Sequence, residues 1–387
     1  MKGRDPGEPE LSDHSLTEAL ITRRDLLKSA GMGAAGLAAG AFLVACGGGG
    51  TGAPTSPGGT ATKKTVRVGF AYIGPTTDNG WTFTHDEARK AVEAKFGSQV
   101  KTTFVENVPI SAEASQTFEQ LASSNDLVIA NTEYANFLSD VAARHPDVHF
   151  MECDGHTYTD NLFPYYVAHH RPNYLLGVAG GLLSKTGKLG YVGAFPTATA
   201  FNDVNPMLLG ARTVNPNATV QAVMISSFFD PQKATAATNA LIDGGADYIF
   251  AVMDEPSFLQ VCEKRGVWGA AWNLDIRQFG PNAYVNSYLL QWAPFYIEQT
   301  QKTIDGTWGS QKEPHLLPVN LGKWGDKVPQ DVQSKAAEAK AKMDGGFNPY
   351  TGPLTDNKGK ERLANGQTLS DVQAYSIDWA VQGVTGL

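Results

Sequence analysis

The stretch TVRVGFAYIGPTTDNGWTFTHDEARKAVEAK, residues 65–95, contains the structural unit from which this sequence is built. Residues 66–72 are β-branched and apolar, as in a buried strand, and residues 74–83 are rich in turn formers. Residues 84–87, Thr-His-Asp-Glu, have the spacing of a capping box, and a helix face then follows at Ala88, Ala91, Val92 and Lys95. The stretch therefore predicts a strand, a loop and a helix.

The same alternation continues along the chain. Further short apolar runs predict strands at residues 100–105, 126–130, 148–153, 188–193, 219–225, 248–252 and 267–271, with helical patterns between them. Alternating strands and helices predict parallel sheets covered by helices. Because the pattern restarts near Lys188, the fold class is α/β, with two doubly wound parallel sheets of similar build.

Length, composition and charge agree with two globular domains. The chain has 387 residues, and domains average about 150 residues. Its 31 Lys and Arg against 39 Asp and Glu give a net charge of -8. An acidic chain is a poor ligand for the phosphate backbone, so nucleic acid is not expected as a partner.

The N-terminus has the pattern of an export signal. Arg23 and Arg24 precede an apolar stretch rich in glycine and alanine, and the sequence Leu-Val-Ala before Cys46 resembles a lipobox. We expect residues 1–45 to be a twin-arginine-type signal, Cys46 the lipid attachment and residues 46–64 a flexible tether. A single transmembrane anchor is the alternative, although four glycines interrupt the short apolar run.

The two remaining cysteines, Cys153 and Cys262, lie in different halves of the chain. We favour two buried free thiols over a disulfide between them.

The predicted loops lack the patterns of catalytic and metal sites. No HExxH, GxSxG or CxxC motif occurs after residue 46, and His and Cys do not show metal-ligand spacing. We therefore expect no enzyme, no cofactor and no metal. His85 could act as a base, but a structural or ligand-adjacent histidine is the simpler interpretation.

Aromatic, carboxylate and amide side chains follow the predicted strand ends, where ligands of open α/β sheets bind. Lys and Arg are nearly missing from these loops, with Arg277 the main exception, so a neutral or weakly cationic ring is favoured over an anion. The alternative is that some of these aromatic residues belong to the core. The candidate ligand-binding residues are Asp78, Asn79, Trp81, Glu133, Phe195, Phe201, Asn205, Asp254, Trp272, Asn273 and Asp275.

Ordered motifs along residues 65–387 resemble the basic membrane protein family of ABC-transporter substrate-binding lipoproteins. They begin with the segments around Val68-Gly69-Phe70, Asp78-Asn79-Gly80-Trp81 and His85-Asp86. They continue through residues 175–180, 185–190, 209–212, 215–216, 229–231, 245–247, 306–308, 352–359 and 379–386.

The resemblance implies a periplasmic-binding-protein fold with two lobes joined by a hinge. We expect residues 65–183 and 305–387 to form the first lobe and residues 184–304 the second. Trp81 and either Phe195 or Phe201 would stack on a purine, Asp254, Asn273 and Asp275 would bind its polar edges, and Asp78 and Asn79 would contribute from the first lobe.

The function that the resemblance implies is capture of a purine base or nucleoside for an ABC importer. The partners would be permease and ATPase subunits, together with the membrane through the N-terminal lipid, and the protein would be a monomer in the cell envelope. A sugar or other small polar ligand, bound by a receptor or sensor, is one alternative, because Trp, Asp and Asn also suit carbohydrates. An envelope nucleoside-modifying enzyme that acts through His85 or Asp78 is the other.

Overall fold

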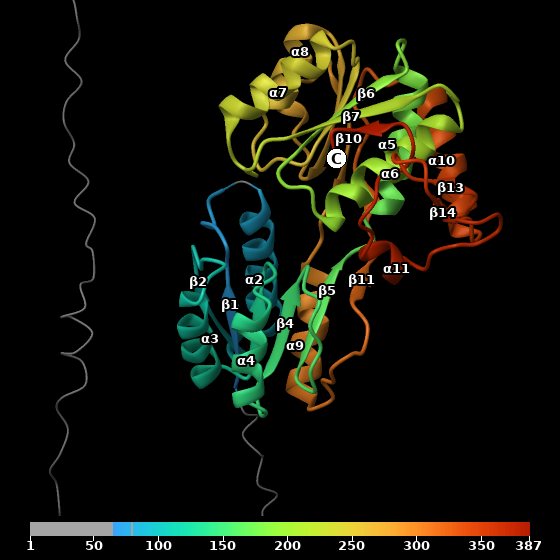
Figure 1. The fold of residues 1–387 in the computed structure, drawn as a ribbon. Helices are drawn as coiled ribbons and strands as arrows, with labels where there is room; N and C mark the ends of the chain where they lie inside the picture. The colour runs from blue at the N-terminus through green and yellow to red at the C-terminus, as the bar shows by residue number, and fades with distance from the viewer. Residues whose placement is uncertain (1–64, 79) are drawn as a thin grey trace, which may run out of the picture. The chain divides into compact units, whose positions relative to one another are not determined.

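The computed structural model describes residues 65–78 and 80–387, which fold as two α/β lobes, each around its own sheet (Figure 1). The expected signal, the tether, Cys46 and Asn79 lie outside the described residues. The first lobe is the part built on the six-stranded sheet, and the second lobe is the part built on the seven-stranded sheet.

The sheet of the first lobe is parallel throughout. In spatial order its strands are β11 (His315–Leu317), β5 (Leu162–Val167), β4 (His149–Cys153), β3 (Leu127–Ala130), β1 (Val66–Ala71) and β2 (Val100–Val105).

The sheet of the second lobe repeats this order with later strands. It runs β12 (Asn320–Leu321), β10 (Tyr284–Leu289), β9 (Trp268–Asn273), β8 (Tyr248–Ala251), β6 (Lys188–Gly193), β7 (Thr219–Met224) and β15 (Val384–Thr385). Only β12 pairs antiparallel in this sheet. In both lobes the first strand lies between the second and the third, so the expected α/β class with two doubly wound sheets is confirmed.

Helices cover both faces of each sheet. In the first lobe α2 (Trp81–Phe96) and α9 (Ala293–Asp305) pack together on one face, and α3 (Glu113–Ser124) and α4 (Asn136–Arg144) on the other. The second lobe has α5 (His170–Leu183) and α6 (Ala198–Arg212) on one face, and α7 (Pro231–Asp243) and α8 (Ser257–Arg265) on the other. Short 3-10 turns follow at η1 (Gly97–Gln99) and η2 (Arg277–Phe279).

Two glycines of the sequence motifs allow α5 and α6 to cross at very short distance. A Cβ at Gly177 would lie 2.0 Å from the carbonyl oxygen of Met207, and one at Gly210 would lie 2.1 Å from that of Tyr174. Any larger residue would push the helices apart, so these motif glycines hold the second lobe together.

The chain passes between the lobes after β5, after β10 and between β11 and β12. The multi-strand hinge is therefore present, but the expected boundaries need correction. Helix α5 packs on α6, and β12 and β15 pair within the second sheet, so most of residues 320–387 do not return to the first lobe. Helix α9 and β11 lie in the first lobe.

The C-terminal segment packs against the second lobe. It contains α10 (Gln330–Asp344), the hairpin β13 (Leu354–Thr355) and β14 (Glu361–Leu363), α11 (Asp371–Tyr375) and finally β15. Figure 1 shows α10, β13 and β14 beside α5 and α6, with α11 at the level where the lobes meet.

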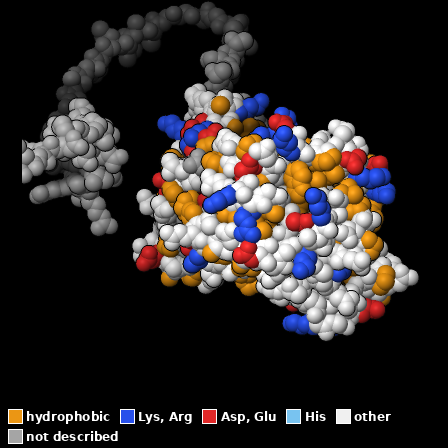
Figure 2. Space-filling view, turned by 90° about the horizontal axis from the view of Figure 1, so that it is seen from above, with side chains coloured by type: hydrophobic (Ala, Val, Ile, Leu, Met, Phe, Trp, Pro, Cys, Tyr) orange, Lys and Arg blue, Asp and Glu red, His pale blue; other side chains and the backbone are white. Residues whose placement is uncertain are grey.

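The surface charge, the two thiols and the hydropathy of the helices complete the description of the fold. Seen from above, Lys and Arg side chains are interspersed with Asp and Glu (Figure 2). Cys153 and Cys262 are both buried free thiols. None of the helices in the described part of the chain combines the length and hydropathy of a membrane span.

Candidate binding site between the two lobes

The two sheets bring their reversal points together. The loop after β1 and the loop after β8 both follow a strand at which the strand order reverses, the usual place for a ligand in such sheets. These loops touch, because the backbone N–H of Trp81 donates to Asp254 Oδ1 at 3.2 Å. A Cβ at Gly80 would lie 2.7 Å from the Cβ of Asp254, so glycine is required for this approach. We call Trp81, Asp254, Trp272 and Asn273 the inter-lobe site.

Two indole rings face each other across this site. Trp81 begins α2 in the first lobe and Trp272 lies on β9 in the second, and their ring centroids are 5.5 Å apart with 18° between the planes. Each ring is fixed within its own lobe. Trp81 Nε1 donates to the carbonyl of Asn131 at 2.7 Å, and Trp272 Nε1 donates to that of Met253 at 3.1 Å. The pair is therefore a stacking surface with one face from each lobe.

A buried aromatic wall supports Trp81. His85 lies edge-on to Trp81 at 4.7 Å, and the ring of Trp292 stacks on His85 at 4.4 Å. His85 Nδ1 is 2.5 Å from the hydroxyl of Tyr296, which is 2.5 Å from that of Tyr165. Burial holds the pKa of His85 well below its usual value, so the imidazole is neutral. Its packing makes it a support of the site.

Asp254 is the carboxylate of the inter-lobe site. Burial, followed by the charge of Asp78, raises the pKa of Asp254 to about 7, while the hydrogen bond from Trp81 lowers it. Its charge therefore changes near neutral pH, and a ligand N–H or O–H beside it would favour the ionised form.

Asn273 ends β9 in an unusual conformation. Its φ is 67°, in the left-handed region, and its side chain is buried. Neither the nitrogen nor the oxygen of its amide has a hydrogen-bond partner among the residues that the structure describes. Buried amides are nearly always paired, so this one is available to a ligand.

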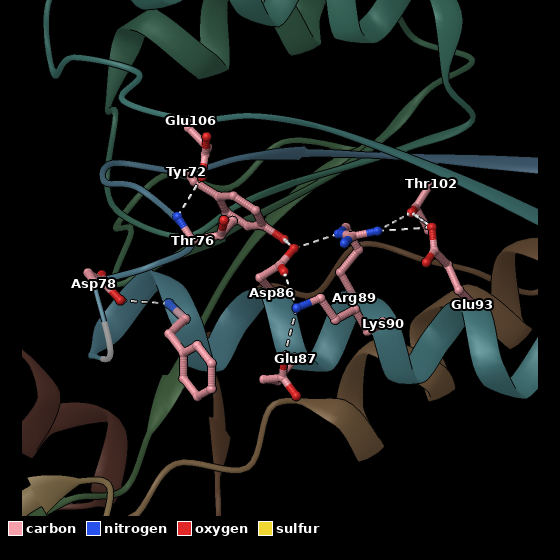
Figure 3. Close-up of polar contacts among 11 residues, drawn as sticks. Tyr72, Thr76, Asp78, Asp86, Glu87, Arg89, Lys90, Glu93, Thr102 and Glu106 are labelled. Atoms are coloured by element: carbon pink, nitrogen blue, oxygen red, sulfur yellow. Dashed lines mark hydrogen bonds and ion pairs between the residues drawn. The ribbon is translucent and has the colours of Figure 1, made fainter. Parts of the chain in front are cut away.

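Asp78 is held by its own loop. Its Oδ1 accepts from the backbone N–H groups of Gly80 at 2.8 Å and Phe83 at 2.9 Å, and its Oδ2 accepts from that of Thr82 at 2.8 Å. Figure 3 shows this carboxylate above the start of α2. Asp78 therefore caps the helix, in addition to its charge effect on Asp254.

This cap corrects the expected start of the helix. Helix α2 begins at Trp81, so Thr84 lies inside it and donates its hydroxyl to the carbonyl of Trp81. The charged residues that follow pair along α2, as Figure 3 shows, with Arg89 Nε 2.6 Å from Asp86 Oδ1. The sequence contained the signal for the earlier start, since Asp78 precedes the helix within reach of its first amides.

Three other expected site residues have structural partners. Phe201 packs against the C-terminal cluster of Tyr350 and its neighbours. Asn205 binds the C-terminal backbone, donating to Trp379 and accepting from Val381. Asp275 forms an ion pair with Arg277 at 2.5 Å. Their side chains therefore hold the second lobe and its C-terminal segment together.

Phe195 follows β6 and Glu133 follows β3, and neither belongs to the stacked pair. Phe195 is 44% exposed and its ring contacts Phe228 at 5.8 Å, so it forms no stack with Trp81. Glu133 is half-buried and its charge raises the pKa values of Glu152 and Asp154. In the described residues the ring that stacks on Trp81 is that of Trp272.

A second contact between the lobes was missed by the sequence analysis. The hydroxyl of Tyr375, on α11, donates to Asp154 Oδ1 at 3.0 Å and lies 3.1 Å from the carbonyl of Gly155, both after β4 in the first lobe. Asp371 anchors α11 to the start of α5 through a hydrogen bond with His170 at 3.1 Å and an ion pair with Arg171 at 3.0 Å. The only available signal was that Asp154 follows a predicted strand.

The hinge itself contains a buried polar network. Asp203 Oδ1 accepts from His169 at 2.9 Å and from Asn173 at 2.8 Å, and its Oδ2 accepts from Tyr191 at 2.7 Å.

Within the described residues no group of His, Cys, Asp or Glu has the arrangement of a metal site.

Comparisons with known proteins find one matching family model and several similar proteins. Residues 65–314 match the family Bmp, described as ABC transporter substrate-binding protein PnrA-like. A purine-binding protein of Brucella abortus is 34% identical over 333 residues, which cover 84% of this chain and 95% of that protein. A putative ABC transporter glucose-binding protein of Haloferax volcanii is 33% identical over 288 residues, 73% of each chain.

Solved structures show the same fold. An ABC transporter solute-binding protein from Conexibacter woesei superimposes with a TM-score of 0.57 at 22% identity, over 73% of this chain and 97% of that one. One from Aeropyrum pernix gives a TM-score of 0.63 at 14% identity, over 73% and 92%.

Proposed function

This chain belongs to the Bmp family of PnrA-like ABC transporter substrate-binding proteins, and we propose that it binds a purine base or nucleoside between its two lobes. Proteins of this family are extracytoplasmic and bind small ligands for transporters with permease and ATPase subunits. They are substrate-binding proteins and not enzymes. The proposal concerns the ligand, its position and the importer that receives it.

The stacked indoles carry the proposal. A planar ring between Trp81 and Trp272 needs about 3.5 Å to each indole, or roughly 7 Å between the two planes. The two indoles stack on each other directly, with ring centroids 5.5 Å apart, so a ligand ring would enter only after the lobes have separated. Stacking contributes about 1–3 kcal/mol per base, and two faces with two hydrogen bonds reach about -8 kcal/mol, a micromolar Kd.

The charges near the site favour an uncharged ligand. Asp254 supplies a carboxylate, and Arg277, the cation nearest in sequence to Trp272 and Asn273, is already paired with Asp275. A phosphate would therefore be repelled by Asp254 in its ionised form, and Arg277 is already neutralised by Asp275, whereas a base or nucleoside would offer N–H groups to the Asp254 carboxylate.

Contacts between the lobes give the ligand a means to select the closed form. Trp81 with Asp254, and Tyr375 with Asp154, both join the first lobe to the second. A ligand that touches both indoles binds the closed form more tightly than the open form, and so shifts the population toward it. The permease could then distinguish loaded from unloaded protein.

One similar protein supports a purine as the ligand, and another supports a sugar. The Brucella relative is a purine-binding protein and covers more of both chains than the Haloferax relative, which is named for glucose binding. Indole faces also stack on sugars, so a sugar remains the second candidate ligand.

Attachment to the membrane through Cys46 forms part of the proposal. The lipobox pattern before Cys46 and the Gly- and Thr-rich tether after it support a lipid anchor on the outer face of the cytoplasmic membrane. Cys46→Ser should move the exported protein from the membrane fraction to the soluble fraction. Equal membrane retention of both forms would contradict the anchor.

Calorimetry with a ligand panel tests the proposed ligand. Adenine, hypoxanthine, inosine and guanosine should give binding heat, with Kd values near or below the micromolar range, while glucose and other sugars should not. Mass spectrometry of small molecules that co-purify with the protein provides an independent measurement. Heat with sugars alone, or with no member of the panel, would overturn the purine proposal.

A further inference from the structure

We propose that Asn273 determines ligand specificity, by pairing through both amide atoms with a ring edge that carries a hydrogen-bond donor beside an acceptor. The inference rests on the proposed function and adds to it which edge of the ring is recognised. Two independent observations on Asn273 carry it: its unpaired amide and its backbone conformation.

The amide of Asn273 is the first observation. The residue is 3% exposed, and its nitrogen and oxygen both lack a hydrogen-bond partner among the described residues. Leaving two buried polar atoms unpaired is costly, and apolar residues of similar size would avoid the cost. The amide lies at the end of the strand that carries Trp272, at the edge of the sheet that faces Trp81.

The backbone of Asn273 is the second observation. Five non-glycine residues in the described chain have a positive φ, namely Asn107, Ala135, Asp154, Ser226 and Asn273. Of these, Asn273 alone also has buried side-chain atoms without a partner among the described residues. Strained conformations of this kind concentrate at ligand sites, where the surrounding structure maintains them.

Neighbouring hydrogen bonds fix this conformation. The carbonyl of Asn273 accepts from the N–H of Leu290 at 3.3 Å, and the N–H of Leu274 donates to the carbonyl of Trp272 at 2.7 Å. The backbone of Asn273 is therefore held on both sides, and Asn273 directly follows Trp272, whose indole is fixed by its hydrogen bond to Met253. A ring stacked on Trp272 would present its edge at a defined position.

The chemistry of an amide defines the edge. Asparagine offers one acceptor and one N–H donor in a single plane, which matches adenine, with its amino group beside a ring nitrogen. Hypoxanthine and guanine offer N1–H beside O6 and also match. A purine without a substituent at carbon 6 presents only acceptors on this side and does not match.

Substitution at Asn273 should change this preference in a defined direction. Asn273→Asp replaces the donor with a second acceptor, which suits the two adjacent N–H groups of guanine but not adenine. We expect the variant to lose roughly 10-fold or more in affinity for 9-methyladenine and to bind 9-methylguanine in preference. If the site requires ribose, adenosine and guanosine replace these ligands.

Asn273→Gly separates recognition from strain, because glycine adopts a positive φ readily. It should fold at least as well as the wild type, yet bind 9-methyladenine and 9-methylpurine with similar affinity, while the wild type prefers 9-methyladenine by roughly 10-fold. Asn107→Gly is the matched control. Asn107 is exposed, has a φ of 56° and follows the edge strand β2 of the first lobe, so this change should leave both affinities unchanged.

Calorimetry and thermal unfolding of the four proteins give distinct outcomes. Loss of discrimination in Asn273→Gly and reversed preference in Asn273→Asp would support the inference. If purines bind the wild type but both variants keep its ligand ratios, the inference is overturned and the proposed function stands. If no purine binds the wild type, both are overturned.

Discussion

Each lobe brings the edge of its sheet, where the strands end, to the inter-lobe site. The polar side chains at the first lobe's edge are already hydrogen-bonded within the protein, whereas those at the second lobe's edge can bind a ligand. On the first lobe, Asp78 receives three backbone hydrogen bonds, and Asn131 accepts from the N–H of Ile73 at 2.8 Å. On the second lobe, Asn273 is unpaired among the described residues, and Asp254 accepts from the first lobe. The polar groups at the edge of the first lobe thus hold Trp81 in place, and those at the edge of the second lobe are the ones that a ligand would bind.

Removing an indole should have the largest effect on binding. Trp81→Ala or Trp272→Ala should each weaken purine binding by about 1–3 kcal/mol, roughly 5- to 150-fold in Kd, because one face of the stack is lost. Titration calorimetry measures the change.

The control for this prediction lies on the same strand as Trp272. Trp268 starts β9 at the opposite end and is half-buried, so Trp268→Ala removes an indole without touching the inter-lobe site. Its Kd should equal that of the wild type. An equal loss in all three variants would show that stacking between the lobes is not the cause.

Substitutions of the two carboxylates, Asp78 and Asp254, should have different effects: one should lower the stability of the fold, and the other should lower the affinity for the ligand. Asp78→Ala should lower the free energy of unfolding by about 1–2 kcal/mol, because α2 loses its cap. Asp254→Asn should leave unfolding nearly unchanged and weaken binding. Urea titrations and calorimetry on the same samples distinguish the two effects.

Glu87→Ala is the control for the cap. Glu87 is exposed on the same helix and forms an ion pair with the exposed Lys90, so its loss should cost little. If Asp78→Ala weakened binding strongly at unchanged stability, Asp78 would be a ligand contact, and the contrast between the two edges would fail.

The first lobe should also show a pH dependence of stability. Burial raises the pKa of Glu152 to about 8, so this carboxyl binds its proton more tightly in the folded chain than in the unfolded one. The stability that the proton provides is complete below about pH 4 and is lost as the pH rises toward 8. We expect a melting temperature a few degrees lower at pH 8.5 than at pH 6.

Glu152→Gln should reduce this difference. The oxygen that accepts from the N–H of Tyr134 at 2.6 Å is retained in glutamine, while the titrating proton is removed. Glu361→Gln, at an exposed position on β14, should leave the difference as in the wild type. A melting temperature that rises toward pH 8.5 in the wild type would contradict the assignment.

The sequence predicted the regular part of the fold, and four of the eleven candidate residues come together in the inter-lobe site, for physical reasons. All eight expected strands are present, because each is a run of β-branched or apolar residues. Strands β5 and β10 were missed, since proline interrupts one and asparagine and serine the other. Residues 320–387 were placed in the wrong lobe because strand pairing over such distances leaves no local pattern.

Prediction of the site residues from the sequence is limited in a similar way. Trp81, Asp254, Trp272 and Asn273 were predicted from their positions after strands, and the structure brings them together. Asp78 and Asp275 occupy equivalent positions, but nearby donors use their carboxylates. Sequence position shows that a side chain reaches the edge of a sheet. It does not show whether the surrounding backbone has already paired it.

The smallest expected effect comes from the contact between Tyr375 on α11 and Asp154 in the first lobe. It tests whether the C-terminal segment, together with the edge of the second lobe, helps to hold the two lobes together. Tyr375→Phe removes the hydrogen bond to Asp154 and should weaken ligand binding by about 1 kcal/mol, because the closed form loses one bond between the lobes. Tyr350→Phe is the matched control, since the hydroxyl of Tyr350 donates to Asn202 within the second lobe. That variant should lose stability but keep its affinity. If Tyr375→Phe behaved in the same way as Tyr350→Phe, α11 would stabilise the second lobe only, and closure would depend on Trp81 and Asp254 alone.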